Sequence, residues 1–365
     1  MAVLLAVVVA TQTGGASATG VSGIRAAGPR LPDHLGRAWR AALVVVPAAV
    51  LLVYGYAHRF MSDDGLIYTR VIRQILAGNG PVVSATERAE ASTSTIWPWL
   101  VAAGSWITRV EPDRLAVFGG LAMTVAGLGL AVDATCRLYS VAGRSPVLLP
   151  AGVIVLLAVP PVWDFASSGL ETGLGTLWLA ACWWLLVRAR PAQRRAQGAA
   201  RLSARGAALV AVVFGQGPLI RPDLAIVSAC FLVALLLLVR PGWVTGVLLM
   251  VAAGALPLAY ELFRAGYYGV LLPLPGLAKE GTRFYWPRGL HYLGDFLSPY
   301  WLWWPLAGVA VLLALVAVRH SVPRHVGVGR DSVVVLTPVV AGLLLGIYVV
   351  AVGGDFMHGA CCCRR

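Results

Sequence analysis

The sequence contains one adjacent pair of acidic residues, Asp63 and Asp64, in the long polar interval 58–99 that follows the first apolar span. Two carboxylates at a membrane face lie where a lipid-linked substrate would present its head group, so both are candidate catalytic groups. The alternative is structural, because acidic residues before a helix commonly cap it and face the positive end of its dipole. The pair alone leaves both interpretations open.

Glu171, Arg221 and Asp223 are a second set of candidates, each at the end of an apolar span. Glu171 begins a span, so a capping role is the alternative to substrate binding. Arg221 lies between two spans joined by almost no loop, where prolines interrupt the helix and an unpaired charge is costly. It is therefore either a structural partner of Asp223 or a clamp for a phosphate group.

The polar segment 266–296 carries cations beside aromatic residues. Lys279, Arg283 and Arg288 suit the negative charge of a phosphodiester, and the face of Trp286 suits a sugar ring or a lipid chain. The alternative is an aromatic belt with snorkelling cations at the membrane interface. Both interpretations put this segment at a membrane surface.

The signals for a metal site are weak. Asp355 and His358 are candidates for binding a metal ion or sugar hydroxyls, and the alternative is a solvated span end, since one His and one Asp make an unspecific pattern. The six cysteines lack the spacing of a zinc site. The sequence therefore identifies no cofactor and leaves a divalent cation as an option to be tested.

The elements that must position these residues are membrane spans. The chain of 365 residues is 59 % hydrophobic and 12 % charged, and a soluble domain cannot hide that much apolar surface. We therefore expect an all-α polytopic membrane protein embedded in the lipid bilayer. Apolar runs predict about nine spans, at residues 38–57, 115–133, 146–163, 173–189, 207–220, 223–239, 242–262, 297–318 and 332–352.

The distribution of arginines predicts the orientation of these spans. Most arginines lie in short links between spans, which is the positive-inside pattern, so the net charge of +13 does not predict a nucleic-acid partner. We expect residues 1–37 to form a basic cytoplasmic tail and residues 38–353 to form the transmembrane domain. Loops 58–95 and 266–296 then lie on the extracytoplasmic face of the plasma membrane, together with the candidate residues.

Two short helices are predicted in and beside the first loop. Apolar residues recur at helical spacing after Asp63, which predicts an amphipathic helix that begins at Ser62 or Asp63, ends at residues 78–80 and lies on the membrane surface. Its apolar residues are Leu66, Ile67, Val71, Ile72, Ile75 and Leu76. Residues 96–107 are apolar but too short to cross easily, so we expect an interfacial or re-entrant helix with Trp97, Trp99 and Trp106 as belt residues.

These motifs carry a family resemblance that covers about residues 40–359. The acid pair in the setting DDGLIYTRVIRQILAGNGPV looks like the GT-C class of polyprenyl-phosphate-dependent glycosyltransferases. The ordered runs ERAEASTSTIWPWL, SSGLETGLG, GPLIRPDL, LPLPGLAKEG and GGDFMHG narrow the resemblance to the terminal β-(1→2)-arabinofuranosyltransferases of mycobacteria and related actinobacteria. The acid pair alone is weak evidence for this family, whereas the ordered set of motifs is strong evidence.

The resemblance implies a GT-C-type helical bundle, a decaprenyl-phosphoryl-arabinofuranose donor and an acceptor at the ends of cell-wall arabinan, in arabinogalactan or lipoarabinomannan. It implies that Asp63 or Asp64 is catalytic, because sugar transfer needs a carboxylate near the acceptor hydroxyl or the anomeric carbon. Which acid acts as base or nucleophile stays open. Cations must stabilise the departing phosphate, and the candidates are Arg221, Lys279, Arg283 and Arg288; the other substrate-binding candidates are Glu171, Asp223, Trp286, Asp355 and His358.

The chain departs from this family after residue 359. Similar proteins continue with further spans and a C-terminal domain, whereas this chain ends in ACCCRR. Loss of one base from codons for Arg-Met-Leu-Leu-Pro would encode Ala-Cys-Cys-Cys-Arg, so we expect residues 354–365 to be a truncated, frameshifted end. Such a truncation would put acceptor binding and activity in doubt.

Two other functions stay open beside arabinofuranosyl transfer. One is a related GT-C transferase that moves another sugar, such as mannose. The other is a transporter or flippase for lipid-linked sugars, which predicts charges or broken helices at mid-membrane and repeated halves. The sequence shows neither feature clearly, and its chemistry collects at one face, which favours a transferase.

Overall fold

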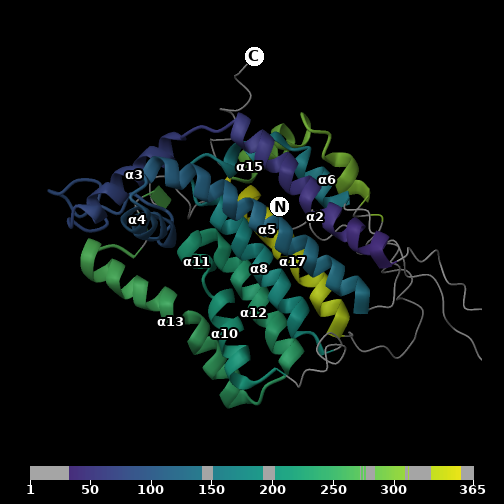
Figure 1. Cartoon of the computed structure of the whole chain (residues 1–365). Coiled ribbons are helices and arrows are strands. Elements are labelled where there is room, and N and C mark those ends of the chain that lie inside the picture. Colours follow the sequence, from purple (N-terminus) through teal and green to yellow (C-terminus); the bar gives the residue numbers. More distant parts are fainter. Residues whose placement is uncertain are drawn as a thin grey trace, which may run out of the picture.

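The computed structural model describes residues 33–141, 151–191, 202–271, 273, 275–276, 284–308, 311 and 330–354. Every regular element within these residues is a helix, as the apolar composition predicted. Figure 1 shows them as a bundle. The helices are α2 (Asp33–Ala57), α3 (Asp63–Leu76), α4 (Ile96–Thr108), α5 (Pro112–Val141), α6 (Ala151–Leu157), α7 (Pro160–Ala166), α8 (Thr172–Ala189), α10 (Ala204–Phe214), α11 (Gly217–Ile220), the 3-10 helix η2 (Pro222–Leu224), α12 (Ala225–Val239), α13 (Trp243–Tyr268), α15 (Trp286–Leu297) and α17 (Arg330–Val352).

Five helical segments are long and apolar enough to cross a membrane. An α-helix rises 1.5 Å per residue, so a segment of 18 residues spans about 27 Å, close to the thickness of a bilayer core. Two shorter apolar segments, Ala41–Ala57 and Ala204–Ile220, accompany them. The chain is therefore an all-α polytopic membrane protein. The five long segments are Pro112–Leu138, Thr172–Ala189, Pro222–Val239, Trp243–Tyr268 and Ser332–Val352.

Three of the nine predicted spans are not continuous helices in the described part of the chain. The span predicted at 207–220 is divided into α10 and α11 by a turn at residues 215–216. The span predicted at 146–163 is divided into α6 and α7, because Pro160 and Pro161 end the first helix and begin the second. The span predicted at 297–318 begins with turns after α15, and its residues from 309 on lie outside the described part apart from Val311. The described residues thus support fewer full-length spans than the sequence predicted.

The centre of the bundle depends on small residues that let α5 and α8 approach closely. A Cβ added at Gly173 of α8 would lie 2.1 Å from the carbonyl oxygen of Gly120 in α5. One turn further along, a Cβ at Gly127 would lie 3.0 Å from the backbone of Leu177. Glycine at these positions replaces side-chain contacts with backbone contacts, the usual way in which membrane helices pack tightly. The two helices therefore run parallel, and both begin at the end of the bundle that carries the polar loops.

The predicted amphipathic helix is α3, and Ser62 caps it by accepting a hydrogen bond from the Gly65 amide. Only part of its apolar set faces the protein. Val71 and Ile72 are buried, whereas Leu66 and Ile67 are exposed. One part of the apolar surface of α3 therefore packs on the bundle, and the other part is exposed.

The short apolar helix predicted at residues 96–107 is α4, but the prediction that Trp97 is a belt residue is wrong. Trp97 is 1 % exposed, and its indole Nε1 donates a hydrogen bond of 2.9 Å to the Gly169 carbonyl. Trp99 and Trp106 are exposed, in keeping with the predicted belt. Trp97 is therefore a core residue that joins α4 to the segment before α8.

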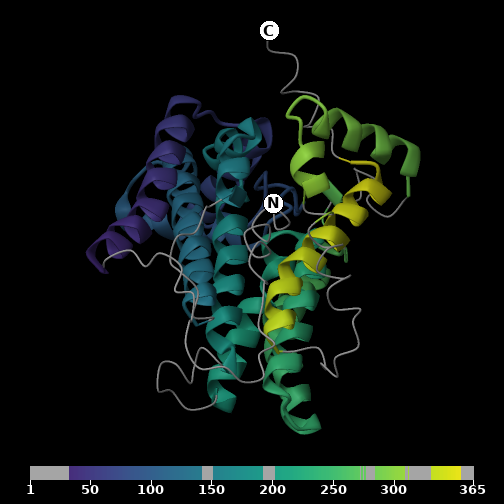
Figure 2. The same cartoon turned by 90° about the vertical axis from the view of Figure 1, so that its right-hand side faces the viewer.

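The later loop region packs on the end of α17. The Tyr285 amide donates to the Ala351 carbonyl at 2.8 Å, and Gly289 of α15 lies against the backbone of Val350. In Figure 2 α15 lies at the upper end of α17, beside the bundle rather than within it. Polar segments lie at helix ends, where a site can form. They follow α2, precede α8, join α11 to α12 and follow α17.

Candidate functional site

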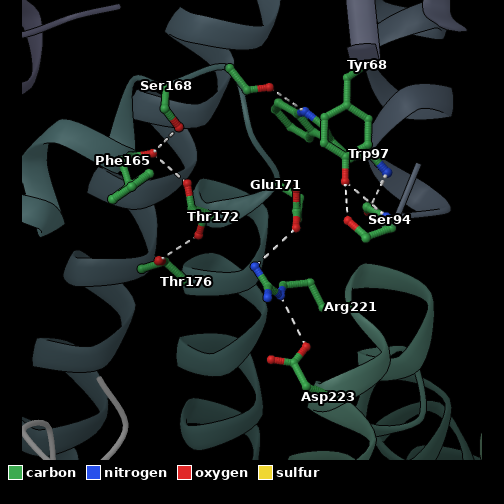
Figure 3. A network of polar contacts seen from close by, with 12 residues as sticks. Tyr68, Ser94, Trp97, Phe165, Ser168, Glu171, Thr172, Thr176, Arg221 and Asp223 are labelled. Atoms are coloured by element: carbon green, nitrogen blue, oxygen red, sulfur yellow. Dashed lines mark hydrogen bonds and ion pairs between the residues drawn. The ribbon is translucent and has the colours of Figure 1, made fainter. Parts of the chain in front are cut away.

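Three charged side chains meet where α8 begins and α11 ends. Arg221 donates from Nε to Asp223 Oδ1 at 3.1 Å, and its Nη1 lies 3.5 Å from Glu171 Oε1. Figure 3 shows the guanidinium between the two carboxylates. The sequence offered Arg221 either as a partner of Asp223 or as a phosphate clamp. The pair with Asp223 is present, and it extends to a second carboxylate 50 residues away in the chain.

The helical backbone is interrupted at Arg221. Its φ of −153° and ψ of 138° are extended, so the chain is not helical at this residue. Pro222 follows and cannot donate a helical hydrogen bond, which separates α11 from η2. The interruption predicted from the prolines is confirmed.

Helix α4 and the residues before it hold both charged segments in place. Trp97 binds the Gly169 carbonyl, two residues before Glu171. The amide of Thr95 donates to the Leu219 carbonyl at 2.9 Å, two residues before Arg221. One short stretch of chain therefore sets the separation of the two side chains.

Glu171 occupies the N-cap position of α8, but its side chain does not cap the helix. It precedes α8, yet its side chain makes no capping hydrogen bond and is 3 % exposed. Its Oε2 is buried without a hydrogen-bond partner. Burial raises the pKa of this carboxyl group, and the positive charge of Arg221 opposes that rise.

Arg221 stays charged in this setting. Burial works to lower its pKa, but the carboxylates of Asp223 and Glu171 outweigh burial and raise it. Its side chain is still 43 % exposed. The side chain is therefore partly accessible while two carboxylates hold its guanidinium.

Tyr68 of α3 is a buried neighbour that the sequence did not single out. Its hydroxyl lies 2.8 Å from Thr93 Oγ1 and accepts a hydrogen bond of 3.0 Å from the Ser94 amide. Burial and the nearby charge of Glu171 raise its pKa well above the ordinary value, so the phenol is neutral at physiological pH. The only signal in the sequence was its place among the apolar residues of the amphipathic helix.

A cavity of about 380 Å³ opens beside the three charged residues. Most of its wall is apolar, and the charged residues lie together on its polar side. Such a cavity suits an amphipathic ligand with a polar head and an apolar chain. The lining residues are Thr124, Leu156, Val159, Pro161, Val162, Phe165, Ala166, Glu171, Thr172, Gly175, Thr176, Leu179, Arg221, Asp223, Leu224, Phe296 and Leu302.

Asp63 and Asp64 occupy the first turn of α3 but do not line this cavity. Ser62 caps the helix, so neither acid is needed for that role. The Ser62 amide and hydroxyl both donate to the Ser168 carbonyl, at 3.0 and 3.1 Å. The acid pair thus lies next to the loop that leads to Glu171, at the positive end of the α3 dipole.

The remaining predicted site residues that the structure describes do not line the cavity. Trp286 and Arg288 are exposed on α15, and only Phe296 from that helix reaches the cavity wall. Lys279, Arg283, Asp355 and His358 lie outside the described residues. Within the described ranges, no three His, Cys, Asp or Glu side chains gather in a way that would hold a metal ion.

The fold and the cavity define a polytopic membrane protein with an amphipathic pocket at one end of its helices. The chain resembles two curated proteins named terminal beta-(1->2)-arabinofuranosyltransferase. It is 39 % identical to the protein of Mycobacterium tuberculosis over 342 residues, which cover 87 % of this chain and 52 % of the relative. It is 38 % identical to the protein of Corynebacterium glutamicum over 322 residues, which cover 84 % of this chain and 46 % of the relative.

The chain spans about half the length of these curated relatives. No family model matches the sequence. No solved structure matches it either. The resemblance to terminal arabinofuranosyltransferases therefore depends on the two relatives, and it agrees with the ordered motifs of the sequence.

Proposed function

We propose that this chain is a membrane glycosyltransferase that moves an arabinofuranosyl group from decaprenyl-phosphoryl-arabinofuranose to the ends of cell-wall arabinan. The reaction takes place on the extracytoplasmic face of the plasma membrane. The observation that carries the proposal is the charged cluster of Glu171, Arg221 and Asp223 in the wall of a mostly apolar cavity. The identity of the sugar rests on the two similar proteins.

The polar side of the cavity is suited to the head of a prenyl phosphodiester. The bond between the anomeric carbon and the phosphate oxygen breaks, and the departing phosphate carries the electron pair away as an anion. Arg221 lines the cavity and is partly accessible, so its guanidinium can stabilise this charge. In this proposal Lys279, Arg283 and Arg288 assist it, while the apolar wall receives the first part of the prenyl chain.

The acceptor side of the reaction needs a carboxylate. The acceptor hydroxyl loses its proton as it bonds to the anomeric carbon, and a carboxylate takes that proton or first attacks the carbon itself. Asp63 and Asp64 serve this role in our proposal, since they are free of capping duty and adjoin the loop before Glu171. Glu171, Asp223, Trp286, Asp355 and His358 are the proposed contacts to the sugars.

The test is a transfer assay in membranes that contain residues 1–365, with a labelled decaprenyl-phosphoryl-arabinofuranose donor and a short arabinan acceptor. We expect label in the arabinan with the wild type, and a loss of about 100-fold or more in Asp63→Asn or Asp64→Asn, the usual scale for a general base or acid. The matched control is Glu87→Gln, which changes an exposed acid in the same loop and should transfer at the wild-type rate.

Each outcome of this assay bears on the proposal. Label that changes leaflet but stays lipid-linked would indicate a flippase instead of a transferase. Wild-type rates in both aspartate variants would remove the acid pair from the mechanism. Absence of transfer by the wild type would end the transferase proposal for residues 1–365.

A further inference from the structure

Glu171 carries a buried oxygen, Oε2, that forms no hydrogen bond of normal geometry within the described part of the chain. The carboxylate is 3 % exposed, its Oε1 faces Arg221, and its Oε2 has no hydrogen-bond partner. A buried acceptor without a donor costs free energy, more so when it is charged. Glu171 also lines the 380 Å³ cavity. The unsatisfied oxygen therefore calls for a hydrogen-bond donor in that cavity.

The surroundings restrict what this donor can be. A metal ion is a poor fit, because Arg221 already brings a positive charge to Glu171 and the described residues offer no cluster of three ligands. The same charge disfavours an ammonium group. Tyr68 is the nearby protein donor that interacts with Glu171, but its hydroxyl is shared with Thr93 and Ser94 and forms no hydrogen bond of normal geometry with Oε2. A carboxylate oxygen can also accept more than one hydrogen bond, so a ligand donor still has a place. The occupant that fits is a neutral donor, which in a ligand of this kind is a hydroxyl group.

The size and lining of the cavity favour a ligand over a single water. A volume of about 380 Å³ is many times the space of one water molecule. The three charged residues contact one another, and most of the remaining lining is apolar. A sugar ring joined to a lipid phosphate has hydroxyls for Glu171, a charge for Arg221 and a chain for the apolar wall.

We propose that Glu171 is a specificity-determining residue whose Oε2 accepts a hydrogen bond from one ring hydroxyl of the lipid-linked sugar. This assignment rests on the function proposed above and gives it a definite contact. Arg221 then has two roles, since it orients Glu171 through Oε1 and meets the phosphate in the cavity. Asp223 holds the other side of the guanidinium through Nε.

Glu90 provides a matched carboxylate within the same protein. It is also buried and also paired with an arginine, Arg264. Both of its oxygens are used, because Tyr260 donates to Oε1 at 2.8 Å and Arg264 donates to Oε2 at 2.7 Å. A substitution at Glu90 therefore perturbs a buried ion pair without removing a free acceptor from the cavity.

The experiment measures the binding of soluble probes to the purified chain in detergent, by the ligand-induced shift in melting temperature and by titration. The probes are farnesyl-phosphoryl-arabinofuranose, three analogues that each lack one ring or side-chain hydroxyl, and farnesyl phosphate without sugar. The proteins are the wild type, Glu171→Gln and Glu90→Gln. In Glu171→Gln an amide oxygen can still face Arg221, while the free acceptor becomes an NH₂ donor.

We expect the wild type to bind the complete probe about tenfold or more tightly than one deoxy analogue, the scale of a hydrogen bond to a charged group. Glu171→Gln should lose this preference and still bind farnesyl phosphate as the wild type does. Glu90→Gln should keep the preference at a temperature where it remains folded. These three results together support the assignment.

The contrary results separate the two proposals. Equal binding of the complete probe and of every deoxy analogue by the wild type, or an undiminished preference in Glu171→Gln, overturns the role of Glu171 and leaves the transferase proposal standing. Failure of the wild type to bind any probe that carries the sugar phosphate overturns the proposed donor site itself, and the role of Glu171 falls with it.

Discussion

Arg264 donates from its Nε to Glu90 Oε2 at 2.7 Å, in an ion pair whose side chains are 9 % and 4 % exposed. Arg264 also pairs with Glu261, one turn earlier in α13. The contact with Glu90 joins α13 to the loop before α4 across 174 residues of sequence. That loop continues to Thr95, whose amide holds the segment before Arg221. The pair therefore helps to hold the loop that contacts the segment before Arg221.

We predict that Glu90→Gln lowers the free energy of unfolding by about 3 kcal/mol, the cost of removing one partner of a buried ion pair. Packing elsewhere on α13 offers little compensation, because only 11 % of its apolar window is buried. The measurement is thermal unfolding in detergent, followed by circular dichroism. Glu87→Gln, an exposed change in the same loop, is the control and should melt with the wild type. Identical melting of all three proteins would refute a stabilising role for the pair.

We predict that Trp97→Phe reduces transfer more than it reduces stability. Phenylalanine fills most of the same volume but cannot donate to the Gly169 carbonyl, so the buried acceptor loses its partner at a cost of about 1–3 kcal/mol. The segment that carries Glu171 is then held less firmly, which should raise KM for the donor. Trp99→Phe on the exposed side of α4 is the control, and an equal rise in KM there would argue against this mechanism.

We predict that Gly173→Ala prevents close packing of α5 and α8. The added methyl group would meet the Gly120 carbonyl oxygen at 2.1 Å, so one of the helices must shift. Overpacking of this kind costs at least about 2 kcal/mol. Gly254→Ala is the matched control, because a Cβ there meets nothing within 4 Å and alanine favours the helix by up to about 1 kcal/mol. The yield of folded protein in detergent and its melting temperature distinguish the two variants.

We predict a pH dependence of stability that disappears in Glu171→Gln. Burial raises the folded-state pKa of Glu171 above its ordinary value of 4.5, so the folded protein binds the proton more tightly than the unfolded chain. The stabilisation that comes from protonated Glu171 is therefore fully present below pH 4.5, and it decreases as the pH rises through the raised pKa. Melting curves from pH 4 to pH 8 should show a smaller decrease for Glu171→Gln than for the wild type, and parallel curves would contradict the prediction.

The sequence by itself determined the class of the fold. Long apolar runs can be satisfied only by helices within a bilayer, because each buried backbone group needs a partner within its own segment. The start of α3 was predictable for a similar local reason, since Ser62 caps a helix through its own neighbours. The break at Arg221 followed from the fixed geometry of proline. The number of continuous spans did not follow as well, because hydropathy does not register the break between α6 and α7.

Only the tertiary structure decided which charged residues share a site. Glu171 and Arg221 are 50 residues apart, and nothing local in the sequence distinguishes a capping glutamate from one that turns toward an arginine in a distant segment. The burial of Trp97 was also beyond local reasoning, because a tryptophan at a helix start suits both an interface and a core. The packing of α4 against the loop before α8 places Trp97 in the core. Local rules act within a few residues, whereas the contacts that build this cavity join segments that meet only when the bundle closes.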